Sequence, residues 1–237
     1  MPHSTLSAAS IWRQRKRLSG RTMQRAPWDA RGHASARAQS CRKSREYRAV
    51  AESNLETAVL IVGYRRADLT AQVLARVAEV RPRRLYVALD GPANDEVAPE
   101  CAAVRALFDA SSLHWAETIN VNIAPKNLGC AERVRSALDW VFAHEPAAII
   151  LEDDTLPGRE WFGWAEQMLH SHRDDPRSGM ICARNALIKW PEDGAGYFRS
   201  RWSMIWAWAT WRERWQAHRA QSKPSPAAVR ERWSDDP

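Results

Sequence analysis

The strongest constraint on the fold of this chain is a regular alternation of apolar and amphipathic segments that begins at Thr57. The apolar run AVLIVGY at 58–64 predicts a buried strand, and LYVALD at 85–90 predicts a second one. Between them, four apolar residues share one face of a helix that Pro82 should end: Leu69, Val73, Val77 and Val80. The pattern therefore predicts a strand, a helix and a second strand in succession.

The same alternation continues along the chain. A weaker strand is expected within 115–123, a buried one in AAIILED at 147–153, and a short one in GMICA at 179–183. Strands joined by helical crossovers form a mostly parallel sheet with helices on both faces, so the expected fold class is α/β. This regularity stops after Arg184, where a Trp-rich part begins.

The net charge of +7 is concentrated at the beginning of the chain. Residues 1–50 hold 12 of the 35 Lys and Arg but only 2 of the 28 Asp and Glu, which leaves 23 basic and 26 acidic residues in the remainder. Because residues 1–54 show no sustained apolar period, we expect a disordered basic tail there, with a nucleic-acid-binding arm as the alternative. The α/β domain is expected over 55–220, followed by a truncated or flexible segment over 221–237.

Cysteine spacing and hydropathy favour a cytoplasmic protein. The four cysteines, at 41, 101, 130 and 182, lack the short spacing of a metal site and are expected to be reduced thiols. No segment approaches the ~18 apolar residues that span a bilayer. Any membrane contact is therefore expected to be peripheral, at the inner face of the membrane.

Polar residues gather where the predicted strands end, which is where open parallel sheets bind ligands. They form four clusters: Gly63 to Arg66, Asp90 with Gly91, Lys126 to Gly129, and Glu152 to Asp154. The sequence has no P-loop, no dinucleotide-binding glycine motif and no G-x-S-x-G motif, so it does not indicate the chemistries that depend on them.

The three consecutive acids Glu152, Asp153 and Asp154 point to a cation. Their mutual repulsion is relieved by a bound metal, and an oxygen-only set with few protein ligands suits Mg²⁺ or Mn²⁺. The alternative is a solvated turn in which Asp154 or Thr155 caps the helix that starts near Gly158.

The order of these motifs resembles the nucleotide-diphospho-sugar transferases of the GT-A fold. The segments IVGYRRADLT, VALDGP, KNLG, IILEDD and WFGWAEQML and a late W-x-W segment follow one another over roughly 57–215. They are most similar to the glycosyltransferase family 2-like, hemolytic-protein-like group of bacterial proteins and to N-acetylglucosaminyltransferases of type I, whose metal motif also reads Glu-Asp-Asp. The domain over 55–220 would then be a GT-A nucleotide-sugar-binding domain.

The resemblance implies donor-binding roles in all four clusters. Gly63, Tyr64 and Arg65 would lie against the nucleoside, and Asp90 would accept a hydrogen bond from a uracil-like base. Lys126, Asn127 and Gly129 would lie beside the ribose and the phosphates, although Lys126 also fits an exposed loop lysine. Glu152 and Asp153 would contact the ribose and the sugar, and Asp154 would bind Mn²⁺ or Mg²⁺ directly.

The Trp-rich segment RWSMIWAWATWRERW at 201–215 is assigned to the acceptor side, because a Trp face stacks on a sugar ring. Trp206 and Trp208 alternate as on a strand, and Arg184 and Asn185 are expected to flank the same cleft. Two other residues, Trp211 and Trp215, share a helical face and are expected to lie in the core.

An inverting transfer needs a carboxylate that takes the acceptor proton. Asp235 and Asp236 are the acids that follow Trp233, and they are the candidates for this base, with a solvated terminal pair as the alternative. Because the resembling family continues further, the chain is expected to be truncated on the acceptor side, to bind nucleotide and metal, and to transfer sugar slowly.

Three functional hypotheses follow. The first is an inverting, metal-dependent glycosyltransferase that moves a sugar from a UDP-like donor to a saccharide or glycolipid acceptor in surface polysaccharide or glycolipid synthesis, without a nucleic acid partner. The second is a sugar-nucleotide-binding module with impaired catalysis. The third is a nucleic-acid-binding α/β protein with a basic tail.

Overall fold

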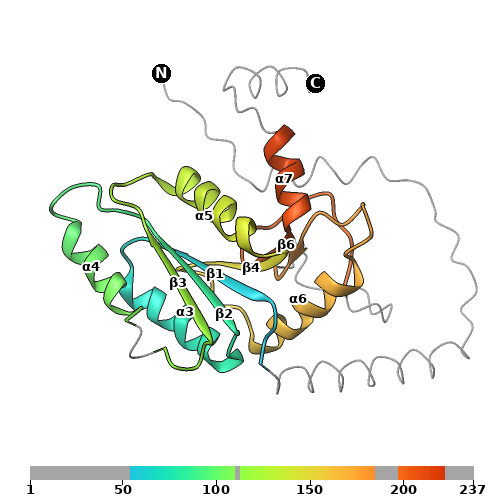
Figure 1. The fold of residues 1–237 in the computed structure, drawn as a ribbon, viewed down its shortest axis with the longest axis horizontal. Helices are drawn as coiled ribbons and strands as arrows, with labels where there is room; N and C mark the ends of the chain where they lie inside the picture. Colours follow the sequence, from blue (N-terminus) through green and yellow to red (C-terminus); the bar gives the residue numbers. More distant parts are fainter. Residues whose placement is uncertain (1–53, 110–112, 185–196, 222–237) are drawn as a thin grey trace, which may run out of the picture. The chain divides into compact units, whose positions relative to one another are not determined.

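The computed structural model describes residues 54–109, 113–184 and 197–221, which form one six-stranded sheet with helices on both faces (Figure 1). The elements in chain order are β1 (Ala58–Gly63), α3 (Ala67–Val80), β2 (Arg84–Leu89), α4 (Ala98–Ala106), β3 (Thr118–Ile123), α5 (Cys130–His144), β4 (Ala147–Glu152), α6 (Arg159–Ser171), β5 (Ile181–Cys182), β6 (Trp208–Trp211) and α7 (Arg212–Gln221). The predicted α/β class is confirmed. Apart from Asn54 and Gln221, the predicted tail and the predicted C-terminal segment lie outside the described residues.

The strands lie in the order β3-β2-β1-β4-β6-β5. β1 pairs in parallel with β2 and with β4, and β2 pairs in parallel with β3, as expected for a mostly parallel sheet. Strand β6 is antiparallel to both of its neighbours, β4 and β5. The Trp-rich segment thus supplies a strand that the sequence pattern did not place between β4 and β5.

Each face of the sheet carries its own hydrophobic core, because successive side chains of a strand point to opposite faces. Val59 and Ile61 of β1 pack in the core that α3, α4 and α6 cover, whereas Leu60 and Val62 pack in the core that α5 covers. Helix α3 buries Val73, Val77 and Val80 as predicted, whereas Leu69, the fourth residue of the predicted face, is half-buried. The helix ends before Arg81, whose φ is 44°. The predicted period of the helix therefore matches the face that is buried.

The Trp-rich segment contributes to both cores. Trp211 is buried on β6 and donates from Nε1 to the Leu169 carbonyl at 3.0 Å. Trp215 lies on α7 and donates from Nε1 to Asp139 of α5 at 2.8 Å. The expectation of a shared helical face is wrong, because the helix begins only at Arg212 and the two rings pack in cores on opposite faces of the sheet. Trp211 is in the core, as predicted.

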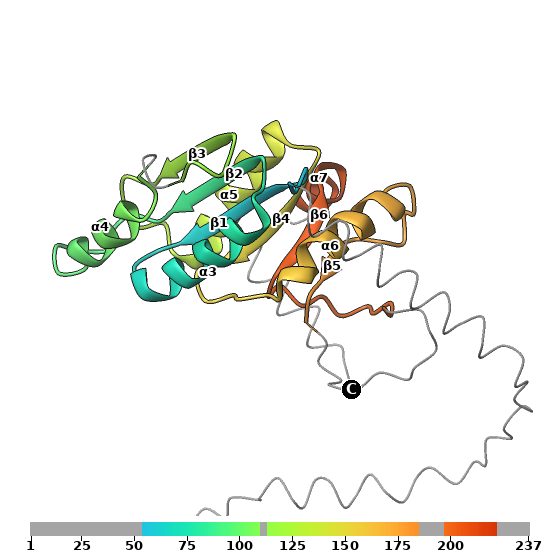
Figure 2. The same cartoon turned by 90° about the horizontal axis from the view of Figure 1, so that it is seen from below.

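The chain changes direction across the sheet at β1. Helices α3 and α4, which follow β1 and β2, lie on one face, and α5, which leads back to β4, lies on the other (Figure 2). Beyond the carboxyl ends of β1 and β4 the covering layers therefore diverge, and open α/β sheets bind ligands at this place. Within the described residues, no helix combines the length and hydropathy needed to cross a bilayer.

The two edges of the sheet differ in length. Edge strand β3 has six residues, TINVNI, without a charged side chain, and Val121 and Ile123 on it are exposed. Edge strand β5 has two residues.

Candidate functional site

Three acids and one arginine, Glu152, Asp153, Asp154 and Arg66, form a cluster at the carboxyl ends of β1 and β4, which we call the acid cluster. Glu152 is the last residue of β4, and Asp153 and Asp154 follow it. The Arg66 guanidinium, which comes from the loop after β1, donates to both oxygens of Asp153, and its Nη2 lies 3.1 Å from Oδ2 of Asp154. Asp153 is buried, with 6% of its side chain exposed, whereas Asp154 has 39% of its side chain exposed. The sequence places Arg66 in the polar cluster after the first predicted strand but assigns no role to it.

The charges of this cluster act on one another. Burial raises the pKa of Glu152, and the nearby carboxylates of Asp154 and Asp153 raise it further, while Arg66 opposes the shift. The hydrogen bond to Asp153 raises the pKa of Arg66, so the guanidinium stays charged. Among the described residues, no group of three or more His, Cys, Asp and Glu side chains is arranged to hold a metal ion. A cation here would therefore need further ligands from water or substrate.

Asp90, just after β2, is the centre of a second cluster, the Asp90 cluster, which also lies beyond the carboxyl ends of the strands. Its Oδ1 accepts from the Gly91 and Leu128 backbone N–H groups, both at 2.9 Å. Its Oδ2 accepts from Asn127 Nδ2 and from the Gly129 N–H, both at 3.1 Å. The carboxylate is buried and engaged on both oxygens, so it joins the loop after β2 to the loop before α5. A contact of Asp90 with a nucleotide base stays a prediction.

Two glycines lie where these loops meet, and one of them is required for their close approach. A Cβ on Gly91 would lie 2.5 Å from the carbonyl carbon of Lys126, so only glycine fits there. The Gly63 carbonyl accepts from the Asp90 N–H at 2.9 Å, and a Cβ on Gly63 would lie 3.9 Å from that of Asp153. Gly63 therefore lies between the acid cluster and the Asp90 cluster, which the structure brings together.

The remaining predicted donor residues lie around these two clusters. Tyr64 is half-buried, and the Arg65 guanidinium lies 5.8 Å from its ring centroid and 3.6 Å from Glu100. Arg65 therefore points to Glu100 on α4 and not to Asp153 or Asp154. Lys126 is exposed, in agreement with either interpretation of it.

Arg133, on the first turns of α5, is a buried residue that the sequence reasoning missed. Its Nη2 donates to the carbonyl and to the side-chain oxygen of Asn122, at 2.6 and 2.9 Å. Burial lowers its pKa, and attraction to Asp90 partly offsets that shift. It secures the end of β3 beside the Asp90 cluster. A lone Arg on an otherwise apolar helix face was the available signal.

The predicted acceptor residues divide into two kinds. The Arg184 guanidinium lies over the Trp206 ring, 4.1 Å from its centroid, and 53% of Trp206 is exposed. Trp208 is 6% exposed because it lies within β6, which leaves little of its ring for an acceptor. Asn185, Asp235 and Asp236 lie outside the described residues.

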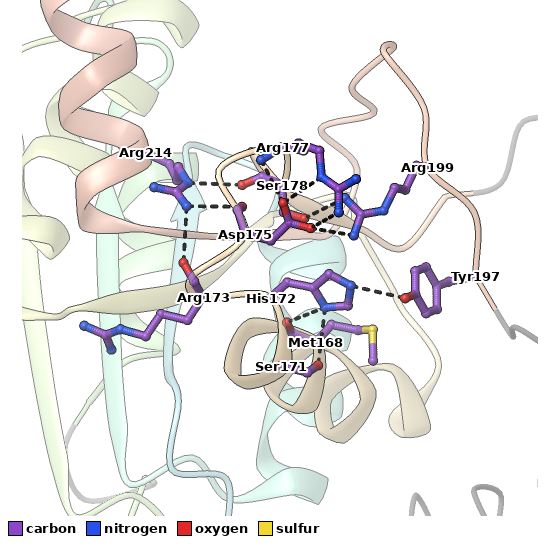
Figure 3. A network of polar contacts seen from close by, with 10 residues as sticks. All are labelled: Met168, Ser171, His172, Arg173, Asp175, Arg177, Ser178, Tyr197, Arg199 and Arg214. Atoms are coloured by element: carbon purple, nitrogen blue, oxygen red, sulfur yellow. Dashed lines mark hydrogen bonds and ion pairs between the residues drawn. The ribbon is translucent and has the colours of Figure 1, made fainter.

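A further polar network surrounds Asp175, before β5 (Figure 3). Its carboxylate binds Arg177 at 2.9 Å and Arg199 at 2.7 Å, and these hydrogen bonds lower its pKa, that of Arg177 most. Arg214 of α7 donates to the carbonyls of Arg173 and Asp175. β5 runs parallel to β4, so the residues just before β5 lie at the end of the sheet where β4 begins. Glu152, the last residue of β4, lies at the opposite end. It joins α7 and residues 197–199 to the end of α6.

The comparisons with known proteins give likenesses to solved structures and no match by sequence. No protein-family model matches the sequence, and no curated protein matches it. Among solved structures, a mannosyltransferase from Pyrobaculum calidifontis, in complex with GDP-Man and Mn²⁺, matches with 19% identity and a TM-score of 0.45. The match covers 81% of this chain and 57% of that chain, so this chain spans under two thirds of the neighbour's length. A likeness at this level does not assign a function.

Proposed function

We propose that this protein is a metal-dependent glycosyltransferase of the GT-A type, which moves a sugar from a nucleoside diphosphate donor to a hydroxyl acceptor. The observation that carries the proposal is the position of Asp153 and Asp154 beyond β4, beside the loop after β1, where the covering helices diverge. The Asp90 cluster meets the same edge through Gly63. The motif order of the sequence supports a UDP-like donor and an inverting transfer.

The residues at this edge fit a hard divalent cation. Asp154 offers a half-exposed carboxylate, and Mg²⁺ or Mn²⁺ takes its other ligands from water and phosphate oxygens, which fits a site with few protein ligands. When bound, the cation supplies positive charge to the diphosphate leaving group. Asp154 is the residue that would hold it.

The chain's own residues would orient the donor. Asn127 donates to Asp90 and to the Gly91 carbonyl, so it fixes the loop that carries Lys126. The exposed Lys126 ammonium is then placed for the phosphates, whose charge it complements. Tyr64 and Gly63 would border the nucleoside.

The acceptor side is assigned to Arg184 and Trp206. An exposed indole face with a guanidinium above it offers an apolar surface and hydrogen-bond donors for a saccharide or glycolipid in surface polymer synthesis. Asp235 or Asp236 is proposed as the base that takes the hydroxyl proton.

Calorimetric titration of UDP with and without Mn²⁺ tests the proposal. Binding should require Mn²⁺ and should weaken by at least about tenfold in Asp154→Asn, because a metal ligand is lost. Asp174→Asn removes an exposed carboxylate before β5, at the other end of the sheet, and should bind like the wild type. Equal binding by all three proteins, or the same binding without Mn²⁺, contradicts the proposal.

Turnover separates an enzyme from a binding module. UDP release from a UDP-sugar that rises on adding acceptor extracts indicates transfer. Metal-dependent binding without such release indicates the impaired module, and GDP in place of UDP tests the assignment of the base.

A further inference from the structure

The acid cluster already contains a cation that belongs to the protein. One guanidinium, that of Arg66, contacts the carboxylates of both Asp153 and Asp154. The Arg65 side chain beside it in sequence contacts Glu100 instead. A metal that binds Asp154 must therefore reach a carboxylate that Arg66 occupies.

We propose that Arg66 is the resident counter-cation of Asp154 and that it makes binding of the divalent cation depend on the nucleotide. In the free protein the guanidinium satisfies Asp154, and the divalent cation binds there only when the guanidinium leaves that carboxylate. This inference rests on the proposed function, because it concerns the same metal site.

Arg66 binds Asp153 more strongly than Asp154, so the contact with Asp154 is the one expected to break. Nε and Nη2 both donate to Asp153, whose side chain is buried, whereas a single contact of 3.1 Å reaches Asp154, whose side chain is 39% exposed. A charge pair is screened less where it is buried. Release of Asp154 therefore leaves the guanidinium anchored on Asp153.

The backbone of Arg66 limits how far its charge can move. Its carbonyl accepts from the Thr70 N–H at 2.9 Å and from Thr70 Oγ1 at 2.7 Å, at the start of α3. After Asp154 is released, the guanidinium remains close to the entering cation, and the two positive charges repel each other. A diphosphate that arrives with the cation cancels this repulsion with its own negative charge. Cation and nucleotide should consequently bind cooperatively.

Mn²⁺ binding in the absence of nucleotide tests this directly, with free Mn²⁺ measured by electron paramagnetic resonance. Arg66→Gln should bind Mn²⁺ about tenfold more tightly than the wild type, the effect of removing one nearby positive charge. The gain should vanish in the double variant Arg66→Gln/Asp154→Asn, which shows that it arises at Asp154.

Arg173→Gln is the matched control for this nucleotide-free titration. It removes the same charge from an exposed side chain that pairs with Glu213 and lies before β5, at the end of the sheet opposite Asp154, and should change Mn²⁺ affinity by less than about twofold. An equal gain in Arg173→Gln, or no gain in Arg66→Gln, overturns the inference.

Arg66→Lys decides the matter if the glutamine variant does not fold, since Asp153 is then buried without a cation. An ammonium can pair with Asp153 but lacks the planar fork that reaches two carboxylates, so this variant should gain affinity by roughly threefold. A folded Arg66→Lys with wild-type Mn²⁺ affinity overturns the inference.

Titration with UDP present measures the cooperativity and distinguishes this inference from the proposed function. UDP should tighten Mn²⁺ binding more in the wild type than in Arg66→Gln. Cooperativity that is equal in the two proteins overturns the role of Arg66 and leaves the proposed function intact. A nucleotide-free gain in Arg66→Gln without any binding of UDP supports the displacement at Asp154 and contradicts the proposed function.

Discussion

At the scale of single residues, Asp90 holds two loops together, whereas the resemblance in sequence assigned it only a contact with the nucleotide base. Four donors from two loops converge on its carboxylate, and an amide in its place would direct an NH₂ group at some of them. Asp90→Asn should therefore lower the free energy of unfolding by about 1–3 kcal/mol, measured by urea denaturation. Asp95→Asn, at an exposed position in the following turn, should leave it unchanged. Equal stability of the two variants would show that the four contacts are unimportant.

Gly91 tests the close approach of the same loops. Its replacement by Ala would press a methyl group against the backbone of Lys126, so we expect a loss of more than about 2 kcal/mol in the free energy of unfolding. Gly179→Ala is the control, since a Cβ there meets nothing within 4 Å. The idea fails if the two alanine variants unfold at the same urea concentration.

Part of the site could be predicted at this scale, because the position of a residue relative to the predicted strands determines the end of the sheet at which it lies. Asp90, Asn127 and Asp154 follow or precede elements whose ends must share one edge of a parallel sheet. The pairing of Arg66 with Asp153 could not be predicted, because it depends on the pairing of β1 with β4 and on a side-chain orientation. The burial of Trp208 depends in the same way on the neighbours of β6.

At the scale of elements, β6 and α7 illustrate the limit of sequence patterns. The elements up to α6 followed from apolar periods, which were strong for β1, β2 and β4 and weaker for β3. Helix α7, RERWQAHRAQ, buries no residue fully, so its sequence has no apolar period from which its bounds could be predicted. The antiparallel direction of β6 is set by its partners β4 and β5 and not by its own residues.

Trp211 should matter more for the attachment of these elements than Trp215. Trp211→Phe leaves the buried Leu169 carbonyl without its donor and removes ring volume, which should cost about 1–3 kcal/mol in the free energy of unfolding. Trp215→Phe breaks a more exposed bond to Asp139 and should cost less than about 1 kcal/mol. Urea denaturation followed by far-ultraviolet circular dichroism measures both, and the reverse order would contradict this assignment.

At the scale of the whole molecule, the part of the chain that the structure describes supplies two hydrophobic cores, one on each face of the sheet. Deleting residues 1–50, which carry no apolar face, should therefore change Tm by less than ~3 °C and leave UDP binding as it is. Differential scanning calorimetry of the shortened and the full chain provides the comparison. A large fall in Tm would mean that this segment packs on the domain.

The unequal edges of the sheet have a consequence for how copies of this protein can associate. Backbone pairing with another chain needs an edge strand of useful length, and of the two described edge strands β3 offers six residues without a charge, whereas β5 offers two. Two copies that join through β3 cover each other's long edge and leave only the short ones. Association of this kind closes after one step, so concentrated solutions would yield pairs in place of filaments.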